Sequence, residues 1–305
     1  SIIVPSTVKV IDEFTFRDCS KLVDIQLNEG LEEIKYAFRG CTALERIKLP
    51  STLKVIGEDA FRDCSMLVDI QLNEGLDEIK NHAFRGCTAL ESIKLPSTAK
   101  VDKGAFSNCA RLRIVHLNNG LATIGEQVFK GCRSLVSISV PSTVKVVDDG
   151  AFSHCTKLVN VDLNEGLENI ARAFVGCTSL ESISVPSTVK LIEWMAFYGC
   201  TSLVNVQLND GLEEIQRYAF RNCAALESII IPSTVKVIEK EVFARREKLA
   251  NVQLNEGLKC IGDWAFYGCN SLEHIIVPPT VKVIAEFAFY DCSKLVDVQL
   301  NEGLE

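Results

Sequence analysis

Cysteine is the residue of this chain whose number and spacing first suggest chemistry. The 305 residues contain 13 cysteines, and twelve of them recur every 22 or 23 residues, with one member missing between Cys223 and Cys269. Thiolates act as nucleophiles and metal ligands, and pairs of cysteines form disulfides. No C-x-x-C pair occurs, and a tetrahedral metal site needs four converging ligands. The recurrence of one small residue at the same position of nearly every copy instead predicts buried thiols that pack as small hydrophobic groups. Disulfides between adjacent copies and a thiolate metal site are the alternatives.

Two other arrangements could do chemistry. His154 precedes Cys155, a pairing found in thiol nucleophiles, but neighbours in a turn usually point apart and no third residue orients them. The carboxylates are abundant, yet they fall in short polar loops rather than in a pair that would flank a cleft. We find no phosphate loop or hydrolase motif. The sequence therefore predicts a non-enzymatic protein without a cofactor, and a cysteine-based enzyme or redox protein is the weakest alternative.

The cysteines close copies of one repeat, typified by LERIKLPSTLKVIGEDAFRDC at 44–64. About 14 copies of 22–23 residues fill the chain, counting partial copies at both ends. Copies with P-S-T after the first apolar trio alternate with copies that carry N-E-G, so the larger unit is a pair. Such self-similarity indicates stacked units that bury a shared core. We expect one solenoid over 1–305, truncated at both ends as a piece of a longer chain.

Each copy is expected to contain two extended pieces and one short turn of helix. The first piece, L-x-x-I-x-L, alternates apolar and polar residues as a strand does. Proline or the N-E-G turn ends it, V-x-V-I or L-x-x-I follows, and a helical turn at A-F-x-x-C closes the copy. The central positions of the predicted parallel strands are Ile25, Ile47, Ile70, Ile93, Val115, Ile138, Val161, Ile183, Val206, Ile229, Val252, Ile275 and Val298.

Stacking would align equivalent residues into columns along the core. The expected structural ladder comprises Phe61, Phe84, Phe106, Phe129, Phe152, Phe174, Phe197 and Phe220, with Cys64, Cys87, Cys109, Cys132, Cys155, Cys177, Cys200 and Cys223. Removal of one such ring, as in Phe152→Ala, is expected to cost about 3–5 kcal/mol. Arg246 occupies the position of the missing cysteine. Because a buried charge is costly, we expect either a bulge that lets Arg246 reach water or a contact at this point.

The composition and charge of the chain limit the classes of partner that we expect. The formal charge is -8, and no basic tract or long apolar run is present. Nucleic acid is therefore not expected as a partner, and neither is membrane insertion of this segment. Neither end carries a polar cap, so we expect either self-association through uncapped ends or capping by the rest of a parent chain.

The skeleton L-x-x-I-x-L-P…L-x-x-I-x-x-x-A-F-x-x-C resembles the BspA-like, or Treponema-type, leucine-rich repeat over the whole chain. The resemblance implies a right-handed, gently curved solenoid with a parallel sheet on its concave face. It also implies adhesion or protein recognition at a cell surface or after secretion, whereas unpaired cysteines are compatible with the cytoplasm. The family has no fixed binding motif, so no site residue follows from it.

A binding face is expected where side chains flanking the central strand residue point outward. These positions are charged near the N-terminus, small and polar in the middle, and include two isoleucines near the C-terminus. The candidate site is Ser228, Ile230, Asn251, Gln253, His274 and Ile276. We expect a protein or glycan partner there, because recognition surfaces often have an apolar centre and a polar rim. A structural spacer with an ordinary solvated sheet is the alternative.

Overall fold

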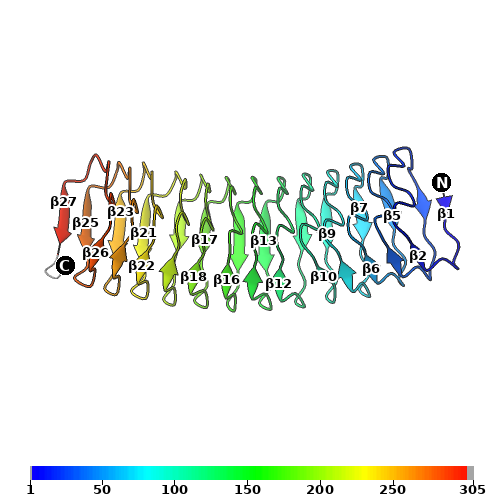
Figure 1. Cartoon of the computed structure of the whole chain (residues 1–305), viewed down its shortest axis with the longest axis horizontal. Coiled ribbons are helices and arrows are strands. Elements are labelled where there is room, and N and C mark those ends of the chain that lie inside the picture. Colours follow the sequence, from blue (N-terminus) through cyan, green and yellow to red (C-terminus); the bar gives the residue numbers. More distant parts are fainter. Residues whose placement is uncertain (1, 301–305) are drawn as a thin grey trace. The chain divides into compact units, whose positions relative to one another are not determined.

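The chain forms a parallel β-solenoid of about 13 turns in a computed structural model that describes residues 2–300. Each turn carries one strand of an odd-numbered series and one of an even-numbered series, and the two series point in opposite directions (Figure 1). The last N-E-G loop of the sequence, at 301–303, lies outside the described residues. The contacts group the chain into two compact units, which we describe separately. A single solenoid over 1–305 stays a prediction.

The first unit comprises residues 1–144 and 149–157. Its odd-numbered strands are β1 (Ile2–Ile3), β3 (Ile25–Gln26), β5 (Arg46–Lys48), β7 (Asp69–Gln71), β9 (Ser92–Lys94), β11 (Ile114–His116) and β13 (Ser137–Val140). Its even-numbered strands are β2 (Val10–Ile11), β4 (Glu33–Ile34), β6 (Val55–Ile56), β8 (Glu78–Ile79), β10 (Lys100–Val101) and β12 (Thr123–Ile124).

The second unit comprises residues 145–148 and 158–305. Its odd-numbered strands are β15 (Asn160–Leu163), β17 (Ser182–Ser184), β19 (Asn205–Gln207), β21 (Ser228–Ile231), β23 (Asn251–Leu254), β25 (His274–Val277) and β27 (Asp297–Leu300). Its even-numbered strands are β14 (Val146–Val147), β16 (Asn169–Ile170), β18 (Leu191–Ile192), β20 (Glu214–Ile215), β22 (Val237–Ile238), β24 (Cys260–Ile261) and β26 (Val283–Ile284).

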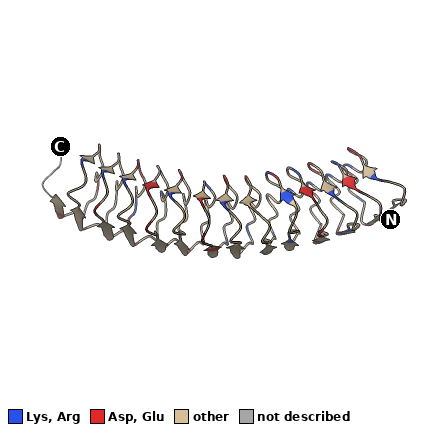
Figure 2. Ribbon diagram, turned by 90° about the horizontal axis from the view of Figure 1, so that it is seen from below, with Lys and Arg blue, Asp and Glu red and all other residues tan. Residues whose placement is uncertain are grey.

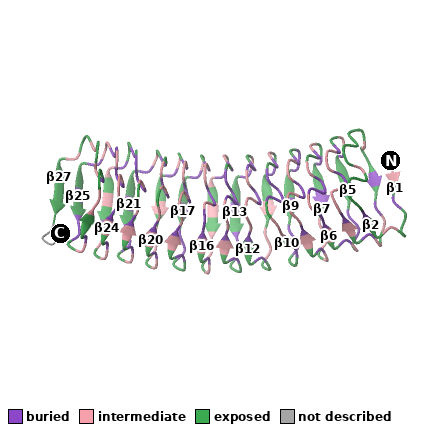
Figure 3. Ribbon diagram, in the orientation of Figure 1, coloured by how far each residue is buried: buried purple, intermediate pink, exposed green. Residues whose placement is uncertain are grey.

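Within each unit the strands pair in parallel with the equivalent strand of the next copy. β1, β3, β5 and β7 form one sheet in that order, and β2 to β10 of the even series form another. The register matches repeat position to repeat position, as in Ile47 with Ile70 and Val252 with Ile229. All thirteen central residues predicted from the sequence lie in strands, which confirms the strand assignment. Buried or half-buried residues alternate with exposed ones along most of these strands, whereas all four residues of β27 are exposed (Figure 3).

The third side of each copy is a series of turns, so the predicted helical turn is wrong. Arg62 N donates to Asp59 O at 3.0 Å, and Cys64 N donates to Phe61 O at 3.2 Å, which are turn bonds across three residues. Asp59 and Asp63 have φ values of 52° and 60°, so the chain leaves the right-handed region twice. Phe61 N instead donates to Ala83 O of the next copy at 2.7 Å. Bonds between copies therefore replace the bonds of a helix.

The phenylalanines and cysteines form the expected ladders inside each unit. Phe61 stacks on Phe84 with ring centroids 5.3 Å apart and planes within 2°, and both rings are fully buried. The cysteine thiols bond across copies, as Cys87 Sγ donates to Phe61 O at 3.2 Å. Phe61 O thus accepts the amide of its own copy and the thiol of the next copy. The cysteine is therefore a small buried group whose thiol also satisfies a buried carbonyl.

The alternation of P-S-T and N-E-G copies follows from side-chain bonds between their loops. Glu29 accepts hydrogen bonds from the hydroxyl and the backbone amide of Ser51, at 2.9 and 3.2 Å. Thr52 Oγ1 accepts from Gly30 N at 2.9 Å and donates to Leu31 O at 2.8 Å. The same pattern recurs at Glu165, Ser187 and Thr188. The N-E-G loops that contain Glu29, Glu74 and Glu165 therefore fit the P-S-T loops that follow them.

Arg246 is fully buried at the cysteine position, so the predicted bulge to water is wrong. Its turn keeps the usual backbone bond, because Leu249 N donates to Arg246 O at 3.2 Å as Leu226 N does to Cys223 O at 3.1 Å. The guanidinium has no exposed surface, and none of its three nitrogens has a hydrogen-bond partner among the described residues. Neighbouring copies thus hold the backbone in register even where the side chain is a poor fit.

Candidate interaction surface

The six predicted site residues lie together on the outward face of β21, β23 and β25. Pairing places Ser228 beside Asn251 and Ile230 beside Gln253, and β25 follows β23 in space. All six side chains are exposed, and they line one open depression of about 710 Å³. We call these six residues the isoleucine patch: Ser228, Ile230, Asn251, Gln253, His274 and Ile276.

The isoleucine patch has an apolar pair inside a polar frame. Ile230 and Ile276 are each 57% exposed, and Gln253 lies in the strand between them. His274 Nδ1 lies 3.9 Å from Asp297 Oδ2 at the edge of the patch. The core residues beneath, Ile229 and Ile275, are buried, so the strands present the two isoleucines from a rigid support. Two isoleucines exposed to this extent favour contact with another apolar surface.

Several of the equivalent outward positions of the first unit are charged. Arg46 pairs with Asp69, and Lys48 pairs with Gln71, across β5 and β7. Figure 2 marks the Lys and Arg residues in blue and the Asp and Glu residues in red along the loops and strands. Ile114 in β11 is also 51% exposed, and the sequence reading did not single it out. It sits at the outward position before the central Val115, so a listing of that position in every copy would have found it.

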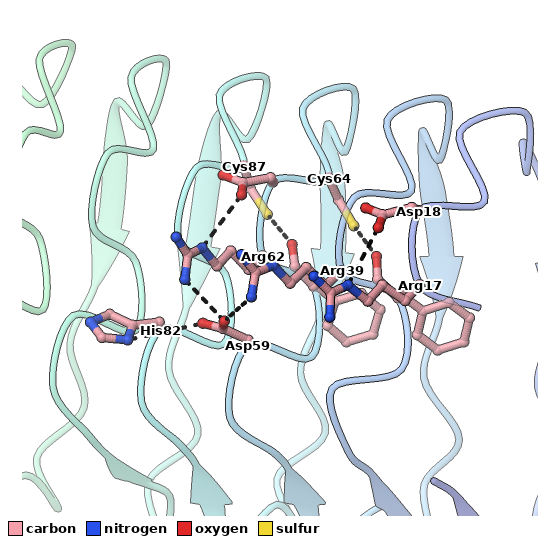
Figure 4. Close-up of polar contacts among 11 residues, drawn as sticks. Arg17, Asp18, Arg39, Asp59, Arg62, Cys64, His82 and Cys87 are labelled. Carbon is pink, nitrogen blue, oxygen red and sulfur yellow. Dashed lines mark hydrogen bonds and ion pairs between the residues drawn. The ribbon is translucent and has the colours of Figure 1, made fainter. Parts of the chain in front are cut away.

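A buried carboxylate in the first unit is a second place where titratable groups meet. Asp59 Oδ2 accepts from Arg39 and Arg62, both at 3.0 Å, while His82 Nδ1 lies 4.0 Å from Oδ1 (Figure 4). The pKa of His82 is lowered, first because burial disfavours its charged form and then because Arg85 is close. Three successive copies contribute these side chains. The cluster ties adjacent copies together, and nothing in it resembles a nucleophile with its base.

The pair His154–Cys155 does not form a thiol nucleophile. Cys155 is buried and its Sγ donates to Phe129 O at 3.2 Å, whereas His154 is exposed. Burial raises the pKa of Cys155 to about 12, because the thiolate would lose its hydration. A thiol that stays protonated is a poor nucleophile.

Thiol reactivity should divide the cysteines by burial. Cys19 is exposed, Cys260 and Cys292 are partly exposed, and the others are buried. We expect native alkylation to modify Cys19 first, and alkylation after denaturation to label all 13 cysteines by mass spectrometry. If an even number of cysteines stayed unlabelled after denaturation, some would be paired in disulfides, and the ladder would not consist of free thiols.

Among residues 2–300, no three His, Cys, Asp or Glu side chains converge in a way that could hold a metal ion. Over the same described range, no helix is long and apolar enough to cross a membrane.

Several solved structures share the fold. A leucine-rich repeat protein from Bacteroides ovatus is 29% identical, with a TM-score of 0.91 over 100% of this chain and 82% of its own. A leucine rich cell surface protein from Faecalibacterium prausnitzii is 25% identical, with a TM-score of 0.53 over 98% of this chain and 86% of its own. The pneumococcal vaccine antigen PcpA is 20% identical, with a TM-score of 0.55 over 98% and 89%, and shows the fold alone. No curated protein matches the sequence.

The repeat itself matches a family model, described as a BspA type leucine rich repeat region, over residues 1–113, 77–172 and 171–296. The matched ranges together span almost the whole chain. Proteins with this repeat and fold are typically non-enzymatic, and the likeness supports a protein-interaction or adhesion scaffold in general terms. The chain belongs to the BspA-type leucine-rich repeat family.

Proposed function

We propose that the chain is a non-enzymatic scaffold that binds a protein partner through the isoleucine patch. The observation that carries the proposal is the exposure of Ile230 in β21 and Ile276 in β25, on either side of β23, among outward neighbours that are polar. Protein interfaces commonly have an apolar centre of this kind surrounded by hydrogen-bonding groups. The patch contains no Phe, Tyr or Trp ring on which a sugar face could stack, so an aliphatic side chain of a protein is the better match.

A site at the cell surface would suit this function. The leucine rich cell surface protein of Faecalibacterium prausnitzii has the same fold and 25% identity, which supports the proposal that this chain also acts there. Most cysteines of the ladder are buried, and this would protect their thiols from oxidation in an oxidising environment. A buried thiol with a raised pKa, such as that of Cys155, reacts slowly. Self-association through the end strands stays a prediction; Ile3 of β1 and Leu300 of β27 are more than half exposed.

The double variant Ile230→Asp with Ile276→Asp tests the proposal. Both side chains face water, so folding should be nearly unchanged, whereas binding should weaken at least about tenfold, or about 1.4 kcal/mol. A partner is first identified by affinity capture, and its dissociation constant is then measured with each variant by calorimetry.

The matched control is Gln26→Asp with Gln71→Asp, which adds the same charge at the same repeat position in the first unit. This control should bind like the wild type. Equal affinity of all three proteins, with melting curves unchanged, would place the site elsewhere. Failure of the wild type to retain any partner would favour the spacer alternative.

A further inference from the structure

A cationic segment lies in the middle of this acidic chain. Residues 103–145 contain Lys103, Arg111, Arg113, Lys130, Arg133 and Lys145 but only one acidic residue, Glu126, giving a formal charge of +5. The whole chain carries -8, so the remainder carries -13. The cations are spread over two copies, and for this reason the sequence shows no basic tract.

The loss of acidic loop residues contributes to this charge. Most copies with the N-E-G turn continue as in Asn28 to Glu33, with acids at Glu29, Glu32 and Glu33. The corresponding positions at 119, 122 and 123 are Asn119, Ala122 and Thr123. Three carboxylates that elsewhere neutralise nearby lysines are thus missing from one copy.

Arg111 and Arg113 of this segment, together with the nearby Lys157, line a single depression in the first unit. Arg111, Arg113 and Lys157 surround a volume of about 350 Å³, with Ser134 and Val136 between them and Glu91 as its one acid. Arg111, Ser134 and Lys157 occupy the same repeat position in three successive copies. Adjacent strands lie about 4.8 Å apart, so cations two copies apart are roughly 10 Å from each other. The small Ser134 leaves the space between them open.

None of these three cations forms an ion pair within residues 2–300. By contrast, Lys103 is held by Glu126 at 2.6 Å and Lys100 by Asp102 at 3.0 Å. Arg111, Arg113 and Lys157 are all exposed, and their side chains keep every donor for an external acceptor. Guanidinium groups bind planar or tetrahedral oxyanions through two parallel hydrogen bonds. The depression, called here the cationic cleft, is therefore built to accept oxyanions.

We propose that the cationic cleft of Arg111, Arg113 and Lys157 binds a sulfated polysaccharide. The cations follow the stacking direction, so successive sulfate groups of one linear chain meet successive copies. The exposed Val136, at 46%, offers an apolar contact to the sugar ring between them. A short sulfated segment matches the length of the cleft, whereas any long polyanion, a nucleic acid included, would extend its charges onto the acidic remainder of the chain, where like charges repel.

Binding of a fluorescent heparin oligosaccharide tests this site. The variant Arg111→Ser, Arg113→Val, Lys157→Ser replaces each cation with a residue that the intervening copy already carries, so the fold should persist. The dissociation constant should rise at least about tenfold, and its dependence on salt concentration should become shallower because fewer counterions are released.

The matched control is Lys21→Ser, Lys248→Ser, Lys294→Ser, which removes three exposed cations at the same repeat position away from the cleft. It should bind heparin within about threefold of the wild type, a change of under 1 kcal/mol. If both triple variants weakened heparin binding equally, the effect would come from net charge alone, and the proposed site would be wrong. If desulfated heparin bound as tightly as heparin, or an oligonucleotide of the same charge bound more tightly, the ligand would not be a sulfated polysaccharide. The isoleucine patch is untouched by these variants, so the two proposals fail separately.

Discussion

Arg246→Cys is expected to raise the free energy of unfolding by about 3–5 kcal/mol, the size of the penalty for an uncompensated buried charge. The guanidinium is fully buried and its three nitrogens lack partners among the described residues. Burial lowers the pKa of Arg246, because the charged form has lost its hydration. A cysteine at 246 would restore the ladder and allow its thiol to donate to Phe220 O, as Cys223 donates to Phe197 O at 3.2 Å.

Thermal and urea unfolding of wild type and variant would measure this gain. Lys248→Ser, two residues away and exposed, is the control and should change stability by no more than about 0.5 kcal/mol. A variant no more stable than the wild type would show that Arg246 reaches a counter-charge or water in solution.

Phe84→Ala is expected to destabilise the chain by about 3–5 kcal/mol, since it removes a fully buried ring and leaves a cavity. The ring stacks on Phe61 and on Phe106, with centroid distances of 5.3 and 5.2 Å, so two copies lose a packing partner. Neighbouring copies depend on each other in a repeat protein, and the loss should lower the cooperativity of unfolding as well.

Phe14→Ala provides the comparison, because Phe14 is 51% exposed. Its removal should cost about 1 kcal/mol or less. Urea denaturation followed by circular dichroism measures both variants. Equal midpoints for Phe84→Ala and wild type would mean that the phenylalanine column does not carry the core.

Much of the fold could be predicted because the repeat imposes local rules many times over. The alternation around Ile47 and its equivalents fixes a strand, and the proline at 50 fixes where it ends. The third side was read as helical because Ala60 and Phe61 favour no other local structure strongly. The turn conformation depends on the hydrogen bond from Phe61 N to Ala83 O, which joins two copies. The sequence of one copy alone does not reveal this bond.

The same reasoning explains the misreading of Arg246 and the omission of the cationic cleft. A single copy suggests that an arginine should escape to water, but neighbours on both sides hold its backbone in the ladder register. The cleft joins Arg111 to Lys157, which are 46 positions apart in the sequence, so no local window shows it. A comparison of each repeat position down the stack would have revealed both.

Site-specific photo-crosslinking tests the central claim, that a partner protein docks on the isoleucine patch. A photoreactive amino acid replaces Gln253, between the two isoleucines, or Gln71, at the equivalent position of β7. With the identified partner, we predict a covalent product from position 253 and none from position 71. The Ile230→Asp, Ile276→Asp background should abolish the product at 253. Crosslinking at position 71 alone, or a product at 253 that survives the double substitution, would contradict the account.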